Sequence, residues 1–181
     1  MQPNRGKSFA ILVALVLEGA AQPVLAGEAC VDFKWDVSKE RALFAEAPVA
    51  LTAGRDPMSA PVVVPNRLYR LKLTIQDKVT FSAVVPARKT AGAPAYAGLA
   101  ALKTPPAGSY RVAVDLPLWI DVVSNGVLMQ PTDFQGQHAC SAPHKIVVFE
   151  LAGAQPFVLQ FSGAAKDDIL LTVTPAPPRK L

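Results

Sequence analysis

The chain has 181 residues, a formal net charge of +4 at pH 7 and 51% hydrophobic residues, enough for one domain with a substantial core. Its 18 lysines and arginines are scattered and form no cluster, so we expect no nucleic-acid partner, because proteins that bind phosphate backbones concentrate basic charge on one face. The sequence contains no Gly-rich phosphate loop and no G-x-S-x-G nucleophile motif, so its catalytic inventory is close to empty.

Residues 1–26 have the pattern of an export signal peptide. Arg5 and Lys7 give a basic start, residues 9–17 form an apolar run, and residues 24–26 match the small-x-Ala pattern after which signal peptidase cuts. The apolar run is too short to cross a membrane, which takes roughly twenty apolar residues, so we expect no membrane span after cleavage. The sequence therefore predicts a periplasmic or secreted protein.

The two cysteines, Cys30 and Cys140, are predicted to form a disulfide. An oxidising compartment and an even pair of cysteines with no other partner favour a single bridge. The bridge would close a loop of about 110 residues and contribute on the order of 4–5 kcal/mol by constraining the unfolded chain. Two alternatives are a metal-binding or redox thiol pair and a lipid-modified Cys30, which Glu28 disfavours because a small residue is expected two positions before such a cysteine.

A short helix is predicted over residues 39–45, near the start of the mature chain. The composition of this segment favours two helical turns, and Asp36 or Ser38 can cap its first turn. Leu43 and Phe44 would then pack the helix onto a sheet.

Alternating apolar and polar residues, the signature of β-strands, recur through the rest of the mature chain. The clearest case is residues 68–75, in which the apolar side chains share one face and the charged or polar ones share the other. Residues 76–78 are predicted to form a turn, and residues 79–85 a second strand that completes a hairpin with one buried face.

Residues 86–108 are rich in Ala, Gly and Pro and show no clear periodicity. We predict a long connection here, with a helical turn near residues 96–102. Connections of this length are commonly functional, but the sequence does not indicate the role of this one.

Five further strands are predicted in the second half of the chain. Residues 110–115 and 118–123 form a pair interrupted by Pro117, which suits a sheet edge or a bend. Asn125-Gly126 is a strong hairpin signal, because both residues tolerate positive φ. The last three strands are predicted at residues 145–151, 156–162 and 169–174, separated by turns that contain Gly153 and Gly163.

Together these elements predict an all-β fold, a two-sheet antiparallel β-sandwich of about 8–10 strands with one short N-terminal helix. We expect residues 27–174 to form this single domain. Residues 175–181 are predicted to be a disordered Pro-rich tail.

His138, His144 and Glu150 are the candidate metal ligands. Two histidines and one carboxylate form the ligand set of a non-haem iron centre, which would make the protein a metal-dependent dioxygenase. Residues 144 and 150 would face the same way on an extended strand but lie about 20 Å apart, so the geometry opposes a shared metal unless the chain folds back near Pro143. The alternative is two loop histidines beside the disulfide and an exposed glutamate at a strand end.

Tyr96 and Trp119 are the candidate ligand-binding residues, because exposed aromatic rings can stack on a sugar ring. Trp119 lies in residues 118–123, a run that is apolar on both faces and therefore typical of a buried strand. Core packing is thus the alternative for both rings, and Tyr96, in the long connection, is the more open case.

Structural motifs also extend over nearly the whole mature chain. They comprise Cys30, Cys140 and residues 35–38, 43–44, 108–112, 119–123, 145–147, 149 and 159–163. With these motifs the chain resembles a family of uncharacterised exported bacterial β-sandwich proteins. Some members carry the name homogentisate dioxygenase, which belongs to a much larger cupin-type enzyme with an iron triad, and this chain reproduces neither its length nor its spacing. The resemblance implies a fold and no reaction.

From the sequence we therefore expect an exported binding or envelope-accessory protein without catalytic activity and without a cofactor. Its partner would be an envelope protein or a small ligand. Two other functions stay open. One is the dioxygenase with His138, His144 and Glu150 as ligands, and the other is a carbohydrate or small-ligand carrier that uses Tyr96 and the connection over residues 86–108.

Overall fold

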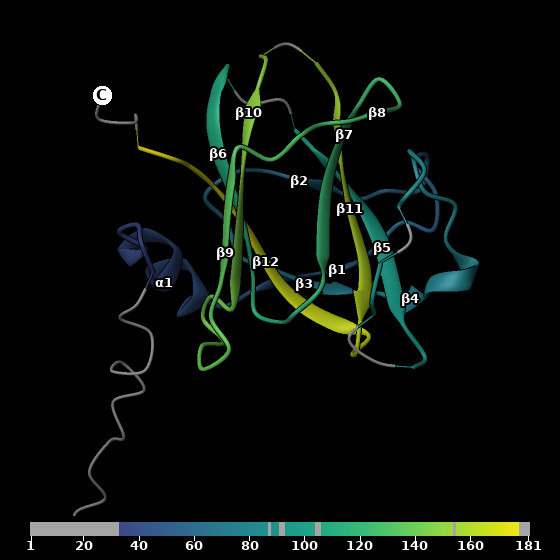
Figure 1. Cartoon of the computed structure of the whole chain (residues 1–181), viewed down its shortest axis with the longest axis horizontal. Coiled ribbons are helices and arrows are strands. Elements are labelled where there is room, and N and C mark those ends of the chain that lie inside the picture. The colour runs from purple at the N-terminus through teal and green to yellow at the C-terminus, as the bar shows by residue number, and fades with distance from the viewer. Residues whose placement is uncertain (1–32, 87, 91–92, 104–105, 154, 178–181) are drawn as a thin grey trace, which may run out of the picture.

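The computed structural model describes residues 33–177 apart from 87, 91–92, 104–105 and 154 (Figure 1). These residues form two six-stranded sheets and one α-helix, which confirms the predicted all-β two-sheet sandwich with a short helix. Twelve strands are found in this part of the chain, against the eight to ten that the sequence predicted. No helix in the described ranges has the length and apolar character needed to span a membrane.

The first sheet has the strand order β1-β3-β12-β6-β10-β9, with every neighbouring pair antiparallel except β1 and β3. Its strands are β1 (Val49–Thr52), β3 (Tyr69–Lys72), β6 (Gly108–Val114), β9 (Asp133–Gly136), β10 (Lys145–Leu151) and β12 (Asp168–Pro175). The predictions for β10 and β12 are confirmed to within one residue. Strand β12 includes Pro175, the first residue of the predicted tail.

The second sheet has the order β2-β5-β11-β7-β8, and β4 pairs with β5 beside this path. Its strands are β2 (Val62–Val63), β4 (Thr74–Ile75), β5 (Tyr96–Leu102), β7 (Trp119–Ser124), β8 (Val127–Leu128) and β11 (Phe157–Ala164). Asn125 and Gly126 join β7 to β8 with φ angles of 50° and 76°, as the Asn-Gly signal predicts for a tight hairpin.

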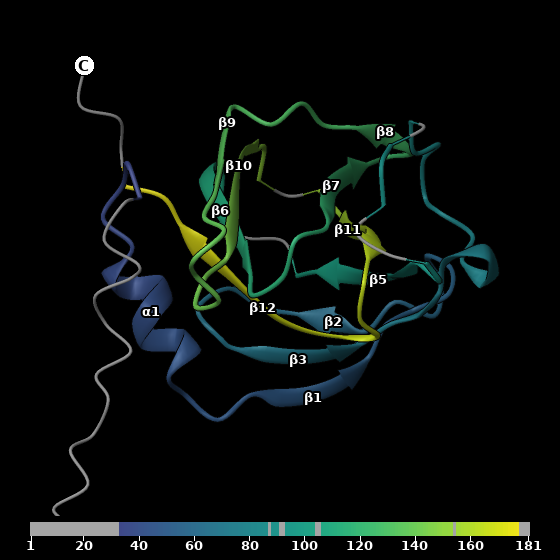
Figure 2. The ribbon, with the colours of Figure 1, turned by 60° about the horizontal axis from the view of Figure 1, so that its bottom comes forward.

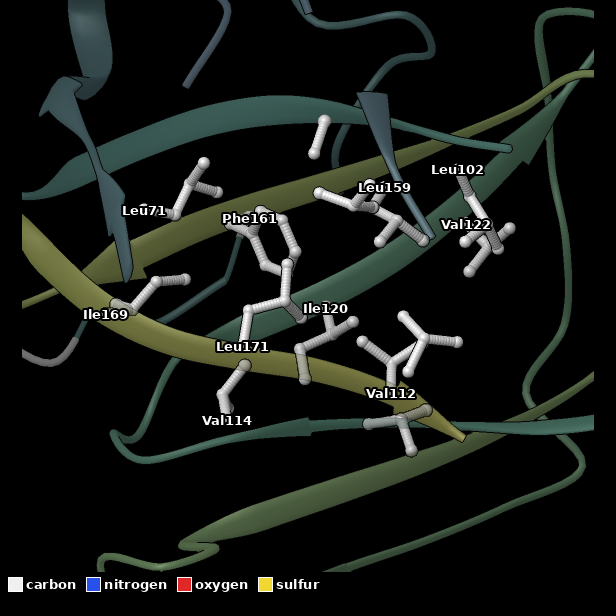
Figure 3. Packing of buried hydrophobic residues seen from close by; sticks show 14 of the residues in the cluster. Leu71, Leu102, Val112, Val114, Ile120, Val122, Leu159, Phe161, Ile169 and Leu171 are labelled. Atoms are coloured by element: carbon white, nitrogen blue, oxygen red, sulfur yellow. The ribbon is translucent and has the colours of Figure 1, made fainter. Parts of the chain in front are cut away.

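The main hydrophobic core lies between the two sheets (Figure 3). Alternate residues of a strand point to the same face, so the period-two pattern of the sequence delivers one apolar row from each strand to this core. The largest of these side chains are fully buried: Leu71, Phe149, Phe157, Leu159, Phe161, Ile169 and Leu171.

The predicted hairpin over residues 68–85 is wrong in its second half. Strand β3 pairs with β1 and β12, and the chain passes from the first sheet to the second at Leu73. Residues 79–85 form no strand and lie over the outer face of the second sheet. There the Ala83 amide and carbonyl are hydrogen-bonded by the buried Gln160 side chain of β11. A side chain, rather than a neighbouring strand, thus supplies the polar partners of this segment.

Two glycine-containing segments also differ from their predictions. Residues 96–102, predicted as a helical turn in a connection, form the inner strand β5, whose two covered faces leave no alternating pattern. At Gly98 a Cβ would lie 2.4 Å from the Ala53 Cβ, so the segment around Ala53 can pack this closely on β5 only because residue 98 is glycine. Gly163, predicted in a turn, lies inside β11 with a φ of 72° at a bulge, where the pairing with β5 shifts register.

The predicted pair of strands around Pro117 is correct as two strands but not as neighbours. Strand β6 belongs to the first sheet and β7 to the second, so Pro117 lies in the bend between sheets. Of the predicted tail, residues 178–181 lie outside the described residues, and so does the predicted signal peptide, residues 1–26.

Helix α1 (Ser38–Phe44) covers the outer face of the first sheet, as predicted, and Figure 2 shows it beside β6 and β12. Val37, and neither of the predicted Asp36 and Ser38, occupies the N-cap position, and no side chain caps the helix there. The Ser38 amide, in the first turn, does donate to the Asp36 side chain at 2.8 Å. Phe44 packs against a second apolar cluster on that face. The cluster consists of Phe33, Val37, Ala113, Cys140 and Ile146.

A buried ion pair joins α1 to this sheet. One Glu40 oxygen accepts from Thr174 Oγ1 and, at 3.4 Å, from Arg111 Nη1, which also donates to the Asp36 carbonyl at 2.8 Å. Arg111 also lies 5.3 Å from the centroid of the Trp35 ring. Glu40 Oε2 and Arg111 Nε are buried without a hydrogen-bond partner, so the ion pair leaves one polar atom of each side chain unsatisfied.

Candidate functional site

Trp119, the first residue of β7, lies at one end of the sandwich and is 38% exposed. The prediction of a buried strand holds for the residues that follow it and is wrong for Trp119, because the strand begins at the rim of the sheet. Its Nε1 donates to the Lys89 carbonyl at 2.9 Å. The bulge at Gly163 lets the ring lie against β11, since a Cβ there would be 3.2 Å from Trp119 Cδ1.

A pocket of about 380 Å³ opens beside Trp119. Several of its lining residues come from the start of β7 and β10 and the end of β9. These strand ends lie at the lower end of the sandwich in Figure 1. We call this cavity the Trp119 pocket. Its lining residues are Lys89, Thr90, Pro117, Leu118, Trp119, Phe134, Gly136, His138, His144, Lys145 and Gly163.

Two cations lie against the Trp119 ring. Arg88 Cζ is 4.7 Å from the ring centroid, and its guanidinium binds both oxygens of Asp121, at 2.8 and 3.0 Å. Lys145 Nζ is 4.9 Å from the same centroid and donates to the Leu118 carbonyl at 2.8 Å. Burial lowers the pKa of Lys145, Arg88 lowers it further by repulsion, and Asp121 opposes the shift. The pocket therefore holds an ammonium group that is short of solvation.

The two histidines meet at the edge of this pocket. Their ring centroids are 6.1 Å apart in an edge-to-face arrangement, with His144 buried and His138 exposed. His144 Nδ1 lies 3.0 Å from the Cys140 carbonyl oxygen, and a carbonyl only accepts, so Nδ1 carries the proton. Nε2 is the ring nitrogen that this contact leaves available.

Glu150 does not join the histidines. It is exposed near the far end of β10, where it is the partner of Ser109, whereas Lys145 at the other end of the strand is the partner of Gly136. Five residue steps along a strand amount to roughly 17 Å. Within the described ranges, no three His, Cys, Asp or Glu side chains are grouped closely enough to hold a metal ion. The structure thus brings together two of the three predicted ligands.

Tyr96, the other ring predicted to bind a ligand, begins β5, is half-buried and packs against the main core. It is not among the residues that line the Trp119 pocket. The connection in which it was placed does contribute, because Lys89 and Thr90 line the pocket. The first part of the segment over residues 86–108 therefore lines the pocket, and Tyr96 does not.

Sequence reasoning missed Arg88, Lys89, Phe134 and Lys145 as site residues. They come from three segments, residues 88–89, 134 and 145, that only the fold brings together. Lys145 did carry a signal, because it shares the strand face of Val147 and Phe149, whose side chains lie in the core. A lysine that shares a strand face with core residues is expected to direct its ammonium toward the interior.

Cys140 is buried in the apolar cluster beside α1. Cys30, its predicted partner, lies outside the described residues, so the disulfide stays a prediction. In the part of the chain that the structure describes, no cysteine is free.

The fold and the pocket together define a class, a two-sheet β-sandwich with a cationic and aromatic pocket at one end. In comparisons with known proteins, no family model and no curated protein matches the chain. The resemblance to exported bacterial proteins therefore stays a prediction, and the Trp119 pocket carries the functional argument.

Proposed function

We propose that the protein is a non-catalytic binding protein that takes a small ligand into the Trp119 pocket. One observation carries this proposal: the pocket combines the partly exposed Trp119 and Phe134, which is 64% exposed, with lysine and histidine side chains in about 380 Å³. Apolar rings with a few polar groups, in a volume of this size, are the usual composition of a small-molecule site. An envelope protein is the alternative partner.

The groups in the pocket favour binding over catalysis. Nucleophilic catalysis requires a hydroxyl or thiol held beside a base, and Thr90 is the one hydroxyl among the described lining residues. His144 is a possible base in the pocket, but its Nδ1–H donates to the Cys140 carbonyl and not to a carboxylate, as it would in a catalytic triad. These contacts orient the rings and lysines without pairing a nucleophile with a base.

A thermal-shift screen of small molecules tests the proposal. We expect at least one compound to raise the melting temperature of the wild-type protein and to leave Trp119→Ala unshifted. A ligand present at 100 times its Kd stabilises the folded state by about 2.7 kcal/mol, which such a screen detects. Trp35→Ala is the matched control, because Trp35 also lies against two cations but outside the pocket. Silence across a broad screen would contradict the proposal.

Metal analysis distinguishes the binding function from the dioxygenase alternative. The contact between His138 and His144 favours that alternative, because it brings two of its three predicted ligands together. We expect protein purified from its natural compartment to carry no stoichiometric iron. Stoichiometric iron that is lost in His144→Ala would overturn the binding proposal.

Export completes the proposed function: the protein acts in the periplasm or outside the cell, with residues 1–26 removed and Cys30 bonded to Cys140. The basic start, short apolar run and cleavage pattern of the sequence support this address. Mass spectrometry of the mature protein is expected to find Gly27 at its start, and the denatured, unreduced protein is expected to have no free thiol. Two thiols per chain would refute the disulfide.

A further inference from the structure

Positive charge is in excess at the Trp119 pocket. Lys89 and Lys145 line the pocket with two cations. Arg88, on the Trp119 ring, has its charge paired by both oxygens of Asp121 and adds none to this excess. Within the described residues, neither Lys89 nor Lys145 forms an ion pair. A recess lined by one sign of charge concentrates ligands of the opposite sign.

Lys145 is the cation best placed to meet a ligand. It shares a strand face with Val147 and Phe149, so its side chain enters the end of the space between the sheets. One N–H of its ammonium donates to the Leu118 carbonyl, and among the described residues the other two have no hydrogen-bond acceptor, although the ammonium also lies against the Trp119 ring. Burial also lowers the pKa of this ammonium, so an anion would replace solvation that the fold has removed.

The pocket also has an apolar part. Phe134 lies on the edge strand β9 and borders the pocket while most of its ring remains exposed. Pro117, Leu118 and the Trp119 ring continue this surface. An exposed apolar surface beside a polar recess is the usual mark of a ligand with both an apolar and a charged part.

We propose that the Trp119 pocket binds a small organic oxyanion, a carboxylate or phosphate group attached to an apolar ring. The oxyanion accepts hydrogen bonds from the ammonium groups of Lys145 and Lys89, and the ring lies against Phe134 and Trp119. This inference rests on the proposed binding function and names the class of ligand for the same pocket.

Calorimetric titration with matched probes tests the inference. Benzoate and phenyl phosphate carry both parts of the ligand, benzamide has the ring without the charge, and inorganic phosphate has the charge without the ring. We expect benzoate or phenyl phosphate to bind the wild-type protein. Benzamide and inorganic phosphate are expected to bind with an affinity lower by a factor of about ten or more, because the loss of one charged hydrogen bond weakens binding by about that factor. Benzamide binding as tightly as benzoate would overturn the inference.

Two lysine variants locate the charge. Lys145→Met is expected to weaken benzoate binding about tenfold and to keep the wild-type melting temperature or exceed it, because a half-buried charge is removed. Lys89→Met is a second variant at an exposed position, expected to weaken binding in the same direction. Lys103→Met, exposed beyond the far end of β5, removes the same charge outside the pocket and is expected to leave the affinity within about twofold. Equal losses in Lys145→Met and Lys103→Met would overturn the assignment.

The outcomes also separate this inference from the proposed function. A neutral sugar that binds the wild-type protein but not Trp119→Ala would overturn the oxyanion and leave the binding function standing. A protein that binds neither these anions nor any compound of the wider screen would contradict both.

Discussion

The two tryptophans of the chain lie in similar contacts but in opposite electrostatic settings. Trp35 lies 4.8 Å from Lys34 Nζ and 5.3 Å from Arg111 Cζ, and Trp119 lies at similar distances from two cations of its own. Around Trp35 both cations have carboxylate partners, Asp133 for Lys34 and Glu40 for Arg111. The charges beside α1 therefore cancel within the fold.

Around Trp119 the cancellation is incomplete. Arg88 is bonded to Asp121, whereas Lys145 is bonded to a backbone carbonyl and borders an open pocket. The same pairing of an indole ring with two cations thus stabilises the attachment of a helix in one place and leaves charge for a ligand in the other. Charge balance, more than the residue types, distinguishes the structural tryptophan from the binding one.

The largest expected effect comes from removing a cation beside Trp35. Arg111→Met leaves the Glu40 carboxylate buried and unpaired, so we expect a loss of about 3–5 kcal/mol in the free energy of unfolding. Lys145→Met, the equivalent change beside Trp119, is expected to cost nothing or to stabilise. Denaturant unfolding of both variants measures the difference, and similar losses in the two would break the distinction between the sites.

The double variant Glu40→Leu with Arg111→Met sharpens this test. Replacing both charges removes the unpaired carboxylate, so we expect it to recover most of the stability that Arg111→Met loses. A double variant as unstable as the single one would show that the Glu40 contact with Thr174, and not the ion pair, stabilises the helix attachment.

A change at the bulge of β11 should disturb the Trp119 side alone. Gly163→Ala places a Cβ at a φ of 72° and 3.2 Å from the indole ring, so we expect a loss of roughly 1–3 kcal/mol and a displaced Trp119. Unfolding experiments give the stability, and near-ultraviolet circular dichroism reports the ring. Gly126→Ala, also at positive φ but in the open β7–β8 turn, is the control for backbone strain without the contact.

How far the sequence predicts this molecule depends on how local each feature is. The helix, the Asn-Gly hairpin and β10 follow from capping, turn chemistry and alternation, which act between residues close in the chain. Strand β5 was missed because both of its faces are covered and its small residues show no period. Residues 79–85 alternate in sequence like a strand, but they cover the outer face of the second sheet and no neighbouring strand pairs with them.

The candidate site was predictable only in part. Trp119, His138 and His144 were singled out by residue type, and all three line the pocket. Arg88 lies 31 positions before Trp119 and Phe134 lies 15 positions after it, and no spacing rule links either of them to that ring. Glu150 was grouped with the histidines by ligand chemistry alone, and the length of β10 separates them.

A smaller effect is expected from the indole nitrogen of Trp119. Trp119→Phe keeps an apolar ring but removes the Nε1–H bond to the Lys89 carbonyl, so we expect a loss of about 0.5–1.5 kcal/mol in stability. Hydrogen exchange at Thr90 is expected to speed up more than exchange in β7. Unchanged exchange at Thr90 would show that this bond does not hold the segment.

The smallest expected effect is a dependence of the stability on pH that comes from Asp115. This residue has no contact with either tryptophan, so its effect is a reference for changes unrelated to the two rings. Burial raises its pKa above the ordinary 3.8, while its hydrogen bond from the Leu170 amide opposes the shift. The folded protein therefore binds more protons than the unfolded one between 3.8 and the raised pKa, and stability falls as the pH rises through that window. Unfolding of Asp115→Asn across this range should lack that decrease, and an identical profile would contradict the shift.

The most direct test observes both tryptophans in one experiment. The chain has two indole N–H groups, and each gives a separate nuclear magnetic resonance signal in the ¹⁵N-labelled protein. On titration with benzoate we expect the Trp119 signal, assigned by its loss in Trp119→Phe, to shift and saturate while the Trp35 signal stays in place. Shifts at Trp35, or none at either ring, would contradict the claim that uncompensated charge makes the Trp119 pocket a binding site.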